Sequence, residues 1–347
     1  MKSVQYLDIE TVQVAESPEP EILTVDDVLV RVTMAGICGS DLHLYRGHIP
    51  GMVSGSIMGH EFTGQVIAVG DRVRQFGVGD RVVGTFHVAC GMCDFCRMGQ
   101  FHQCRQGSVF GYGVAFGDLP GAQAEIVRVP FGDINLRKIP DSLSDDRALF
   151  CGDILTTAFG AVRNAQLQPG ETCAIIGAGP VGLMAVMVAG LIGASQVFSI
   201  DRDPVRVGKT KTLGAIPVDS SRTNPMRRIL QQTHGMGADV VIEAVGGPQT
   251  IGLAFQLVRG GGRIVAIGVT SEAEFRFPLM TTLTRDVSFR IGLANIHRDI
   301  DQVMRLVASG RLDPTVVVSH RLSLDEAPEG YSLFHQQKAT KVLLSIG

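Results

Sequence analysis

The sequence predicts an α/β protein with two domains, an antiparallel barrel-like β lobe followed by a doubly wound parallel sheet. Before about residue 150, short alternating runs such as "DDVLVRVTMAG" and "GQVIAVGDRV" are separated by Gly/Asp turns, as in antiparallel strands. After Pro169-Gly170, short continuous apolar strands alternate with helical stretches, as in a parallel sheet buried on both faces. A length of 347 residues is enough for two hydrophobic cores.

The second half contains six predicted strands. In chain order they are "CAIIG", "QVFSID", "AIPVD", "DVVIEAVG", "RIVAIGV" and "DVSFRIG". From about Leu293 the tail predicts a helix, "RDIDQVMRLVASG", and a last strand, "KVLLSIG", which we expect to return to the first lobe. We therefore place one domain at residues 1–153 together with 293–347, and the nucleotide-binding domain at 154–292.

Charge and hydropathy exclude two classes of partner. The formal charge is -3 and the 31 Lys+Arg are spread along the chain, so no nucleic-acid footprint is predicted. The uncharged segment Cys173 to Ala194 is long enough to cross a bilayer. Glycines and Pro180 interrupt its first third, however, and no Lys or Arg flanks it closely. We predict a buried strand, a tight turn and a buried helix there, and no membrane partner.

Four of the seven cysteines lie in "CGMCDFCRMGQFHQC". Disulfides are disfavoured because no charged-then-apolar leader follows Met1, so we expect a reducing, cytoplasmic compartment. The x2, x2, x7 spacing lets Cys90, Cys93, Cys96 and Cys104 converge on one tetrahedral ion, and zinc fits this best. The alternative is four unrelated cysteines. A four-thiolate knot is usually structural, so it leaves the function open.

A glycine-rich stretch, "IIGAGPVG", predicts a dinucleotide site. It lies between a predicted strand and a predicted helix, so a pyrophosphate could rest on the helix N-terminus. The predicted cofactor-binding residues of this stretch are Gly177, Gly179, Pro180, Val181 and Gly182. A packing turn without a ligand is the alternative interpretation.

The next predicted strand ends at Asp201, where a carboxylate can accept hydrogen bonds from both ribose hydroxyls. Because this charge repels a 2′-phosphate, NAD is favoured over NADP. Arg202 follows directly and could bind such a phosphate, so NADP stays possible. Arg206 is included in the same predicted cofactor-binding set.

Two further motifs, "GICGSDLH" and "MGHEFTG", contain Cys38, His43, His60 and Glu61. Singly, each residue is explained by ordinary packing or hydrogen bonding. Together with the cysteine knot and the nucleotide motif, they resemble the zinc-dependent medium-chain alcohol dehydrogenases over essentially the whole chain. The resemblance implies a GroES-like barrel for the first domain, a Rossmann domain for the second, and two zinc ions, one catalytic and one structural.

By this resemblance, Cys38 and His60 bind the catalytic zinc, and the third ligand comes from "FCGDILTTAFGA". Family members carry Cys or Asp there, so Cys151 and Asp153 are both possible; members with "D-x-x-T-T" favour Asp153. A fourth, open position takes water or substrate, and the ion polarises the alcohol oxygen.

The resemblance also implies how the alcohol proton leaves. Ser40 accepts it first and His43 relays it toward solvent, while Asp41 orients His60. Glu61 either orients a ligand or occasionally binds the ion itself and assists water exchange. Lys341, in the last strand, resembles a basic residue that meets the cofactor pyrophosphate.

Gly39 stands where many animal members have a basic residue, so the chain is more similar to bacterial and archaeal alcohol, polyol, threonine and formaldehyde dehydrogenases. We predict hydride transfer between a small-molecule alcohol, whether a primary alcohol, a secondary alcohol or a polyol, and NAD, giving an aldehyde or ketone. Tyr45 and Phe110 are possible pocket residues. The alternatives are a glutathione-independent formaldehyde dehydrogenase or dismutase that holds NAD tightly, and a non-catalytic binding member of the fold. An exposed sheet edge at "DVSFRIG" favours pairing of subunits by strand addition, and the resemblance implies a homo-oligomer, a dimer or tetramer.

Overall fold

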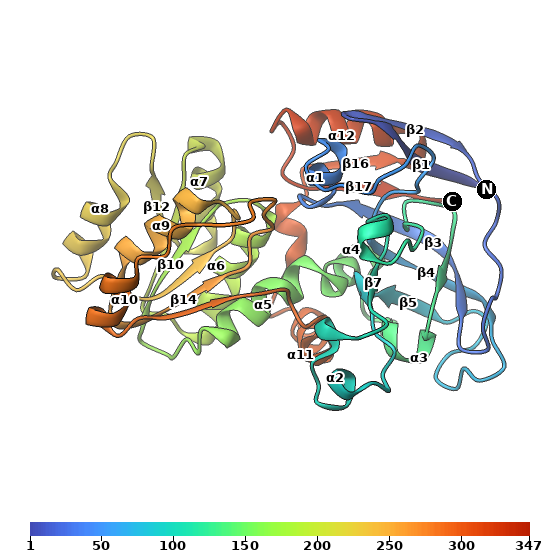
Figure 1. The fold of residues 1–347 in the computed structure, drawn as a ribbon, viewed down its shortest axis with the longest axis horizontal. Coiled ribbons are helices and arrows are strands. Elements are labelled where there is room, and N and C mark those ends of the chain that lie inside the picture. Colours follow the sequence, from blue (N-terminus) through green and yellow to red (C-terminus); the bar gives the residue numbers. More distant parts are fainter. The chain divides into compact units, whose positions relative to one another are not determined.

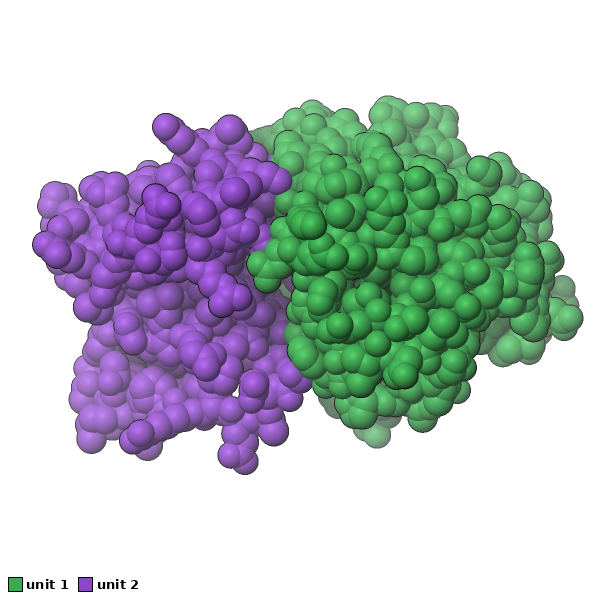
Figure 2. All heavy atoms as spheres, turned by 90° about the horizontal axis from the view of Figure 1, so that it is seen from above, with its two compact units in different colours: residues 1–156, 295–347 green, residues 157–294 purple.

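A computed structural model describes all residues, 1–347, and the chain divides into two compact units (Figures 1 and 2). Unit 1 consists of Met1–Thr156 and Asn295–Gly347, and unit 2 of Thr157–Ala294. These boundaries lie a few residues from those expected from the sequence.

Unit 1 is built on a seven-stranded sheet in which β3 (Val28–Ile37) is central. The strand order is β16-β17-β3-β4-β5-β9, and β8 pairs with β3. Residues of β3 alternate between buried and exposed over its first half, because one face of the sheet covers the core. The other strands are β4 (Glu61–Val69), β5 (Arg81–Gly84), β8 (Ile126–Val129), β9 (Leu136–Lys138), β16 (His320–Ser323) and β17 (Val342–Ser345).

The prediction of an antiparallel lobe is confirmed for most pairs, but β16 and β17 run parallel. The chain between them crosses over through helix α12 (Ala327–His335), and a parallel pair needs such a crossover. The remaining elements of unit 1 are β1 (Lys2–Asp8), β2 (Thr11–Glu16), α1 (Asp41–Tyr45), β6 (His87–Val88), α2 (Asp94–Arg97), β7 (Ser108–Val109), α3 (Gly132–Asn135), α4 (Asp145–Ala148) and α11 (Ile296–Ala308), with short 3-10 turns η1 (Phe101–Gln103), η2 (Val114–Phe116), η3 (Leu149–Gly152), η5 (Pro314–Val317) and η6 (Leu324–Glu326).

Unit 2 is a doubly wound sheet of six parallel strands in the order β12-β11-β10-β13-β14-β15, which confirms the predicted fold class. Its strands are β10 (Thr172–Ile176), β11 (Gln196–Asp201), β12 (Ile216–Asp219), β13 (Ala238–Glu243), β14 (Val258–Ala266) and β15 (Ser288–Ile291). Its helices are α6 (Pro180–Ile192), α7 (Pro204–Thr210), η4 (Lys211–Leu213), α8 (Pro225–Gln232), α9 (Pro248–Leu257) and α10 (Leu279–Arg285), and α5 (Ile154–Asn164) spans the boundary with unit 1.

The uncharged segment from Cys173 folds as β10, a glycine turn and α6, as the sequence predicts. No helix of the structure has both the length and the apolar character needed to span a bilayer. The segment is apolar because β10 is paired on both sides and α6 packs on β10 and β11.

Candidate active site and nucleotide site

Four buried donor groups converge in unit 1. They are the thiol of Cys38, the imidazole of His60 and the carboxyl groups of Glu61 and Asp153, whose donor atoms all lie within 4.8 Å of one another. Antiparallel pairing places Gly36 of β3 opposite Glu61 of β4, so the end of β3 meets the start of β4. Asp153 joins them from the residue just before α5.

Asp153 lies at the centre of this group. Its Oδ2 atom is 3.6 Å from Cys38 Sγ and 3.2 Å from His60 Nε2. Burial raises the pKa of the Cys38 thiol, and the nearby carboxylates of Glu61 and Asp153 raise it further. A bound cation would reverse this, because a metal displaces the thiol proton and offsets the carboxylate charge. Sulfur, nitrogen and oxygen donors at this separation fit a zinc ion with an open position.

A hydrogen-bond network fixes the imidazole of His60. Its Nδ1 atom lies 3.0 Å from Asp41 Oδ1. Asp41 Oδ2 accepts hydrogen bonds from the backbone N–H of Cys38 at 2.9 Å and from Gln123 Nε2 at 3.5 Å. Burial lowers the pKa of His60, but the carboxylates of Asp41 and Asp153 outweigh it and hold that pKa well above its usual value. Gln123 in turn accepts from the Tyr331 hydroxyl at 2.9 Å.

Cys151, the alternative third ligand, lies apart from this group. Its side chain is completely buried, and its nearest hydrogen-bond acceptor is the carbonyl of Arg147, 3.9 Å away. Burial raises the pKa of this thiol to about 12. Its sulfur therefore has the surroundings of a small core hydrophobe.

Lys341 has a partner in unit 1 that the sequence did not indicate. Its side chain is completely buried in unit 1 and its ammonium forms an ion pair with Glu61, which is also completely buried. Burial alone would lower the pKa of Lys341, but the Glu61 carboxylate raises it above its usual value. The predicted contact of Lys341 with a cofactor pyrophosphate stays a prediction. The sequence placed this residue in the last strand but gave no sign of its pairing with Glu61.

Ser40 and two aromatic rings surround the His60 imidazole. Ser40 Oγ is 3.4 Å from His60 Nε2. The rings of Phe86 and Tyr112 meet the His60 ring edge-on, with centroids 6.1 Å and 5.5 Å away. Burial raises the pKa of Tyr112 well above its usual value, although a hydrogen bond with Ser40 acts in the opposite direction. The sequence analysis missed both aromatic residues; the glycines flanking Tyr112 in "FGYG" were the available signal.

The two predicted pocket residues lie in the core instead. Phe110 is completely buried and packs edge-on against Phe62. Tyr45 stacks on Tyr331, with ring centroids 5.4 Å apart. A bulky aromatic residue near a motif is therefore explained here by core packing.

The four cysteines of the knot also come together. Cys93 Sγ lies 3.6 Å from Cys96 Sγ and 4.0 Å from Cys104 Sγ, while the backbone N–H of Cys93 points at Cys90 Sγ, 3.4 Å away. Backbone N–H groups at Arg105 and Cys96 lower the pKa of Cys93 to about 6. Burial raises the pKa of Cys96 to about 12, so a full set of four thiolates requires a cation. Four sulfurs without an added water position fit a structural zinc ion.

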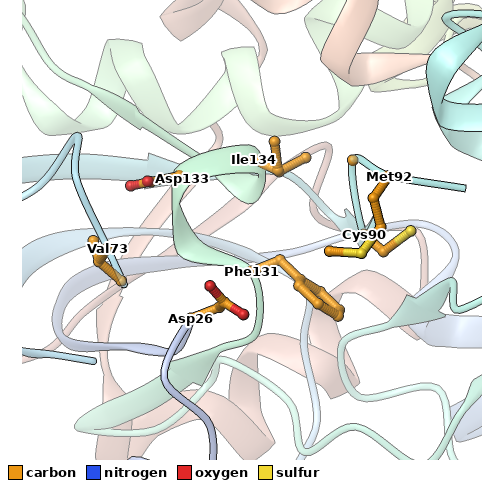
Figure 3. A pocket seen from close by; sticks show the side chains of 8 residues that line it. Asp26, Val73, Cys90, Met92, Phe131, Asp133 and Ile134 are labelled. Atoms are coloured by element: carbon orange, nitrogen blue, oxygen red, sulfur yellow. The ribbon is translucent and has the colours of Figure 1, made fainter. Parts of the chain in front are cut away.

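A cavity of about 230 Å³ lies beside the knot (Figure 3). Phe131, Cys90 and Met92 line one side, and Asp26 and Asp133 contribute carboxylates. Both carboxylates already have partners, since Asp26 pairs with Arg72 at 3.2 Å and Asp133 accepts from two backbone N–H groups. None of the four converging donor residues lines this cavity, so it is separate from that group.

The predicted nucleotide motif forms the turn between β10 and α6. Gly177 has φ 101°, in the region that favours glycine. A Cβ atom on Gly182 would lie 1.8 Å from the Gly177 carbonyl oxygen, so only glycine lets the helix pack here. A Cβ on Gly179, in contrast, would meet nothing within 4 Å, which leaves space beside the α6 N-terminus where a phosphate could approach.

Asp201, at the end of β11, lies next to this turn. Its Oδ2 accepts from the backbone N–H of Ala178 at 2.7 Å, and its Oδ1 from that of Asp203 at 3.0 Å. Arg202 is exposed, while Arg206 pairs with Asp203 at 3.6 Å. The carboxylate is therefore positioned where the nucleotide turn and the second strand meet.

Comparisons with known proteins agree with this geometry. Residues 24–141 match the family model described as the alcohol dehydrogenase GroES-like domain, and residues 180–309 match that of the zinc-binding dehydrogenases. An uncharacterized zinc-type alcohol dehydrogenase-like protein, AdhB, of Bacillus subtilis is 38% identical, with 96% of each chain covered. The solved structure of alcohol dehydrogenase TADH from Thermus sp. ATN1 is 53% identical, with a TM-score of 0.97 and all of both chains covered.

A third relative bears on the cofactor. The structure of a zinc-binding dehydrogenase from Sinorhizobium meliloti, described as bound to NADP, is 31% identical, with a TM-score of 0.87 and 99% and 98% of the two chains covered. The chain therefore belongs to the zinc-dependent medium-chain alcohol dehydrogenase family. It is an oxidoreductase that acts on alcohols and uses zinc and a nicotinamide cofactor.

Proposed function

We propose that this enzyme oxidises primary or secondary alcohols with an apolar substituent, using NAD, and reduces the corresponding aldehydes or ketones. The observation that carries the proposal is the convergence of Cys38, His60 and Asp153 beside the Ser40 hydroxyl. These three residues would hold the catalytic zinc, which polarises the alcohol oxygen when bound, while a bound nicotinamide accepts the hydride.

The residues of the chain supply the path for the alcohol proton. Ser40 Oγ is the hydroxyl beside His60, so it can accept a proton from an alcohol held there and pass its own onward. His43 lies three residues later, on the same face of α1, and its Nδ1 is buried without a hydrogen-bond partner. A neutral imidazole with a free ring nitrogen can take up this proton.

The surroundings of His60 favour an apolar substrate. Phe86 and Tyr112 present ring edges to the imidazole, and the Ser40 hydroxyl lies 3.4 Å from its Nε2 atom. A polyol would place further hydroxyl groups against these rings and lose hydrogen bonds to water. We therefore expect higher kcat/KM for simple primary and secondary alcohols than for polyols.

The position of Asp201 supports NAD as the preferred cofactor. Its carboxylate lies at the nucleotide turn, where it would accept ribose hydroxyls and repel a 2′-phosphate. The relative bound to NADP shows that the family also uses the phosphorylated cofactor, and Arg202 could meet such a group here.

A substrate and cofactor screen with metal analysis tests the proposal. The purified protein would be assayed with primary alcohols, secondary alcohols, polyols and aldehydes, each with NAD and NADP. We expect two zinc ions per chain and NAD-linked oxidation of apolar alcohols. Higher kcat/KM for polyols, or for NADP, would contradict the corresponding part of the proposal. Cofactor that stays bound through gel filtration would favour the formaldehyde dehydrogenase or dismutase alternative.

We further propose a cytoplasmic homo-oligomer. Strand β15 has a partner on one side only, and Ile291 in it is 53% exposed. Leu279, Met280 and Leu283 on α10 are also more than two-thirds exposed. An exposed edge strand with apolar neighbours favours pairing with a second copy. Analytical ultracentrifugation should find a dimer or tetramer, and a monomer would refute the pairing.

The proposed cytoplasmic location is supported by the cysteines. All seven are free, which is consistent with a reducing compartment.

A further inference from the structure

Helix α1 ends in a turn that brings together the side chains of His43 and His48, five positions apart in the chain. The backbone N–H of Gly47 donates to the Leu44 carbonyl at 2.9 Å, and that of His48 donates to the His43 carbonyl at 2.8 Å. Gly47 has φ 69°. These two hydrogen bonds around a left-handed glycine define a Schellman motif, in which the residue after the glycine packs against the residue five positions earlier.

In most such motifs the two packed residues are apolar, but here both are histidines. The His43 and His48 ring centroids are 5.9 Å apart and the rings are tilted by 53°. His43 is half-buried, with its Nδ1 atom enclosed and unpartnered, whereas His48 is exposed. The separation allows a proton to pass between the rings through one bridging water.

The charges around His43 keep it ready to accept a proton. Burial lowers its pKa, and the neighbouring His48 and Arg46 lower it further. The Arg46 guanidinium donates to His335 Nδ1 and to the His335 carbonyl, both at 3.2 Å, and His335 lies 3.7 Å from Glu10. Burial and the Arg46 charge both disfavour a protonated His43, so its imidazole is neutral at neutral pH.

We infer that His48 is the solvent-side residue of the proton path, taking up the proton that His43 receives and setting the pH range in which His43 can receive it. One proton leaves with each hydride transferred: it moves from the alcohol through Ser40 to His43. A protonated His48 first releases its own proton to solvent or buffer, and the neutral His48 then takes up the proton from His43. The inference rests on the proposed function, because it needs an alcohol proton to be released at Ser40.

Two variants of His48 separate its uptake of the proton from its effect on the titration of His43, and a third variant is the control. His48→Gln removes both the charge and the titrating group, and His48→Lys keeps a positive charge but cannot accept a proton near neutral pH. His234→Gln removes an exposed histidine of unit 2 as a matched control. The measurements are the pH profile of kcat/KM for alcohol oxidation, the dependence of kcat on buffer concentration, and an NMR titration of His43 in histidine-labelled protein.

In His48→Gln we expect the His43 titration, and with it the acid limb of the profile, to move to higher pH. In dilute buffer kcat should fall by roughly threefold to tenfold, less than the roughly 10²–10⁴ that a directly reacting base contributes, and imidazole buffer should restore it. His48→Lys should keep the original titration of His43 and still depend on buffer.

Two results would overturn the inference: an unchanged His43 titration in His48→Gln, or turnover of His48→Lys that is as independent of buffer as that of the unaltered enzyme. Failure of the unaltered protein to oxidise any alcohol would instead contradict the proposed function. The NMR titration does not depend on catalysis, so it would still test the coupling between the two histidines.

Discussion

Breaking the buried ion pair of unit 1 should destabilise that unit strongly. Lys341→Met removes the ammonium and leaves the Glu61 carboxylate unpaired at a position with no exposed surface. Removing one partner of a buried pair costs about 3–5 kcal/mol, because an uncompensated charge stays behind. Since 1 kcal/mol moves the melting temperature of a unit of this size by about 2–4 °C, the transition of unit 1 should fall by roughly 6–20 °C.

The chain has no tryptophan, so differential scanning calorimetry is the suitable assay. It would be run on protein freed of the ion near Glu61 but keeping the ion of the cysteine knot, because a cation near Glu61 would offset the unpaired charge and loss of the knot ion would itself destabilise unit 1. Lys338→Met, at an exposed position three residues earlier, is the matched control and should melt like the unaltered protein.

The double variant Glu61→Met with Lys341→Met should recover most of the lost stability, since two apolar side chains of similar volume replace the pair. A Lys341→Met protein that melts with the unaltered one would refute the pairing. A double variant no more stable than Lys341→Met would show that packing, and not charge, caused the loss.

The remaining predictions concern metal and cofactor. Cys93→Ser should aggregate or destabilise the protein, whereas Cys38→Ser should stay folded and lose alcohol oxidation; full activity of Cys38→Ser would contradict its assignment. Asp153→Ala should lower the zinc content from about two to about one per chain, as expected when one ligand set is broken, while Cys151→Ala should keep both ions; the reverse pattern would exchange the two assignments. Asp201→Ser should raise the kcat/KM for NADP relative to NAD by removing the repulsion of a 2′-phosphate, and a ratio unchanged from the unaltered enzyme would contradict that reading of the carboxylate.

Features set by neighbours in the chain were predictable. The glycine turn "IIGAGPVG" lies between a strand and a helix because its glycines permit the backbone geometry of that connection. The cysteines of the knot lie within one short segment, so their spacing already indicates convergence. The central strands β10 and β13 of unit 2 are nearly continuous apolar runs, because a strand between two helical layers buries both faces, whereas the edge strand β15 is mostly exposed.

The resemblance to a family predicted more than the residues alone. It grouped Cys38, His60 and Asp153, which are far apart in the chain and which the structure brings together. It also associated Lys341 with a cofactor phosphate, whereas the structure buries that residue against Glu61. A family pattern predicts which residue type stands at a position. It does not predict which charged side chain of the same protein pairs with that residue in the folded structure.

By itself, the sequence determined the two domains, the knot and the nucleotide turn, because periodicity and short-range spacing encode them directly. Only the tertiary structure decided the pairing of Lys341 with Glu61, the two rings beside His60, the choice of Asp153 and not Cys151 in the donor group, and the contact of His43 with His48. Most of these contacts join residues on different strands, helices or loops, and the last needs a left-handed glycine turn. Which side chains of different elements come into contact depends on strand register, burial and backbone direction. These are defined only once the chain has folded.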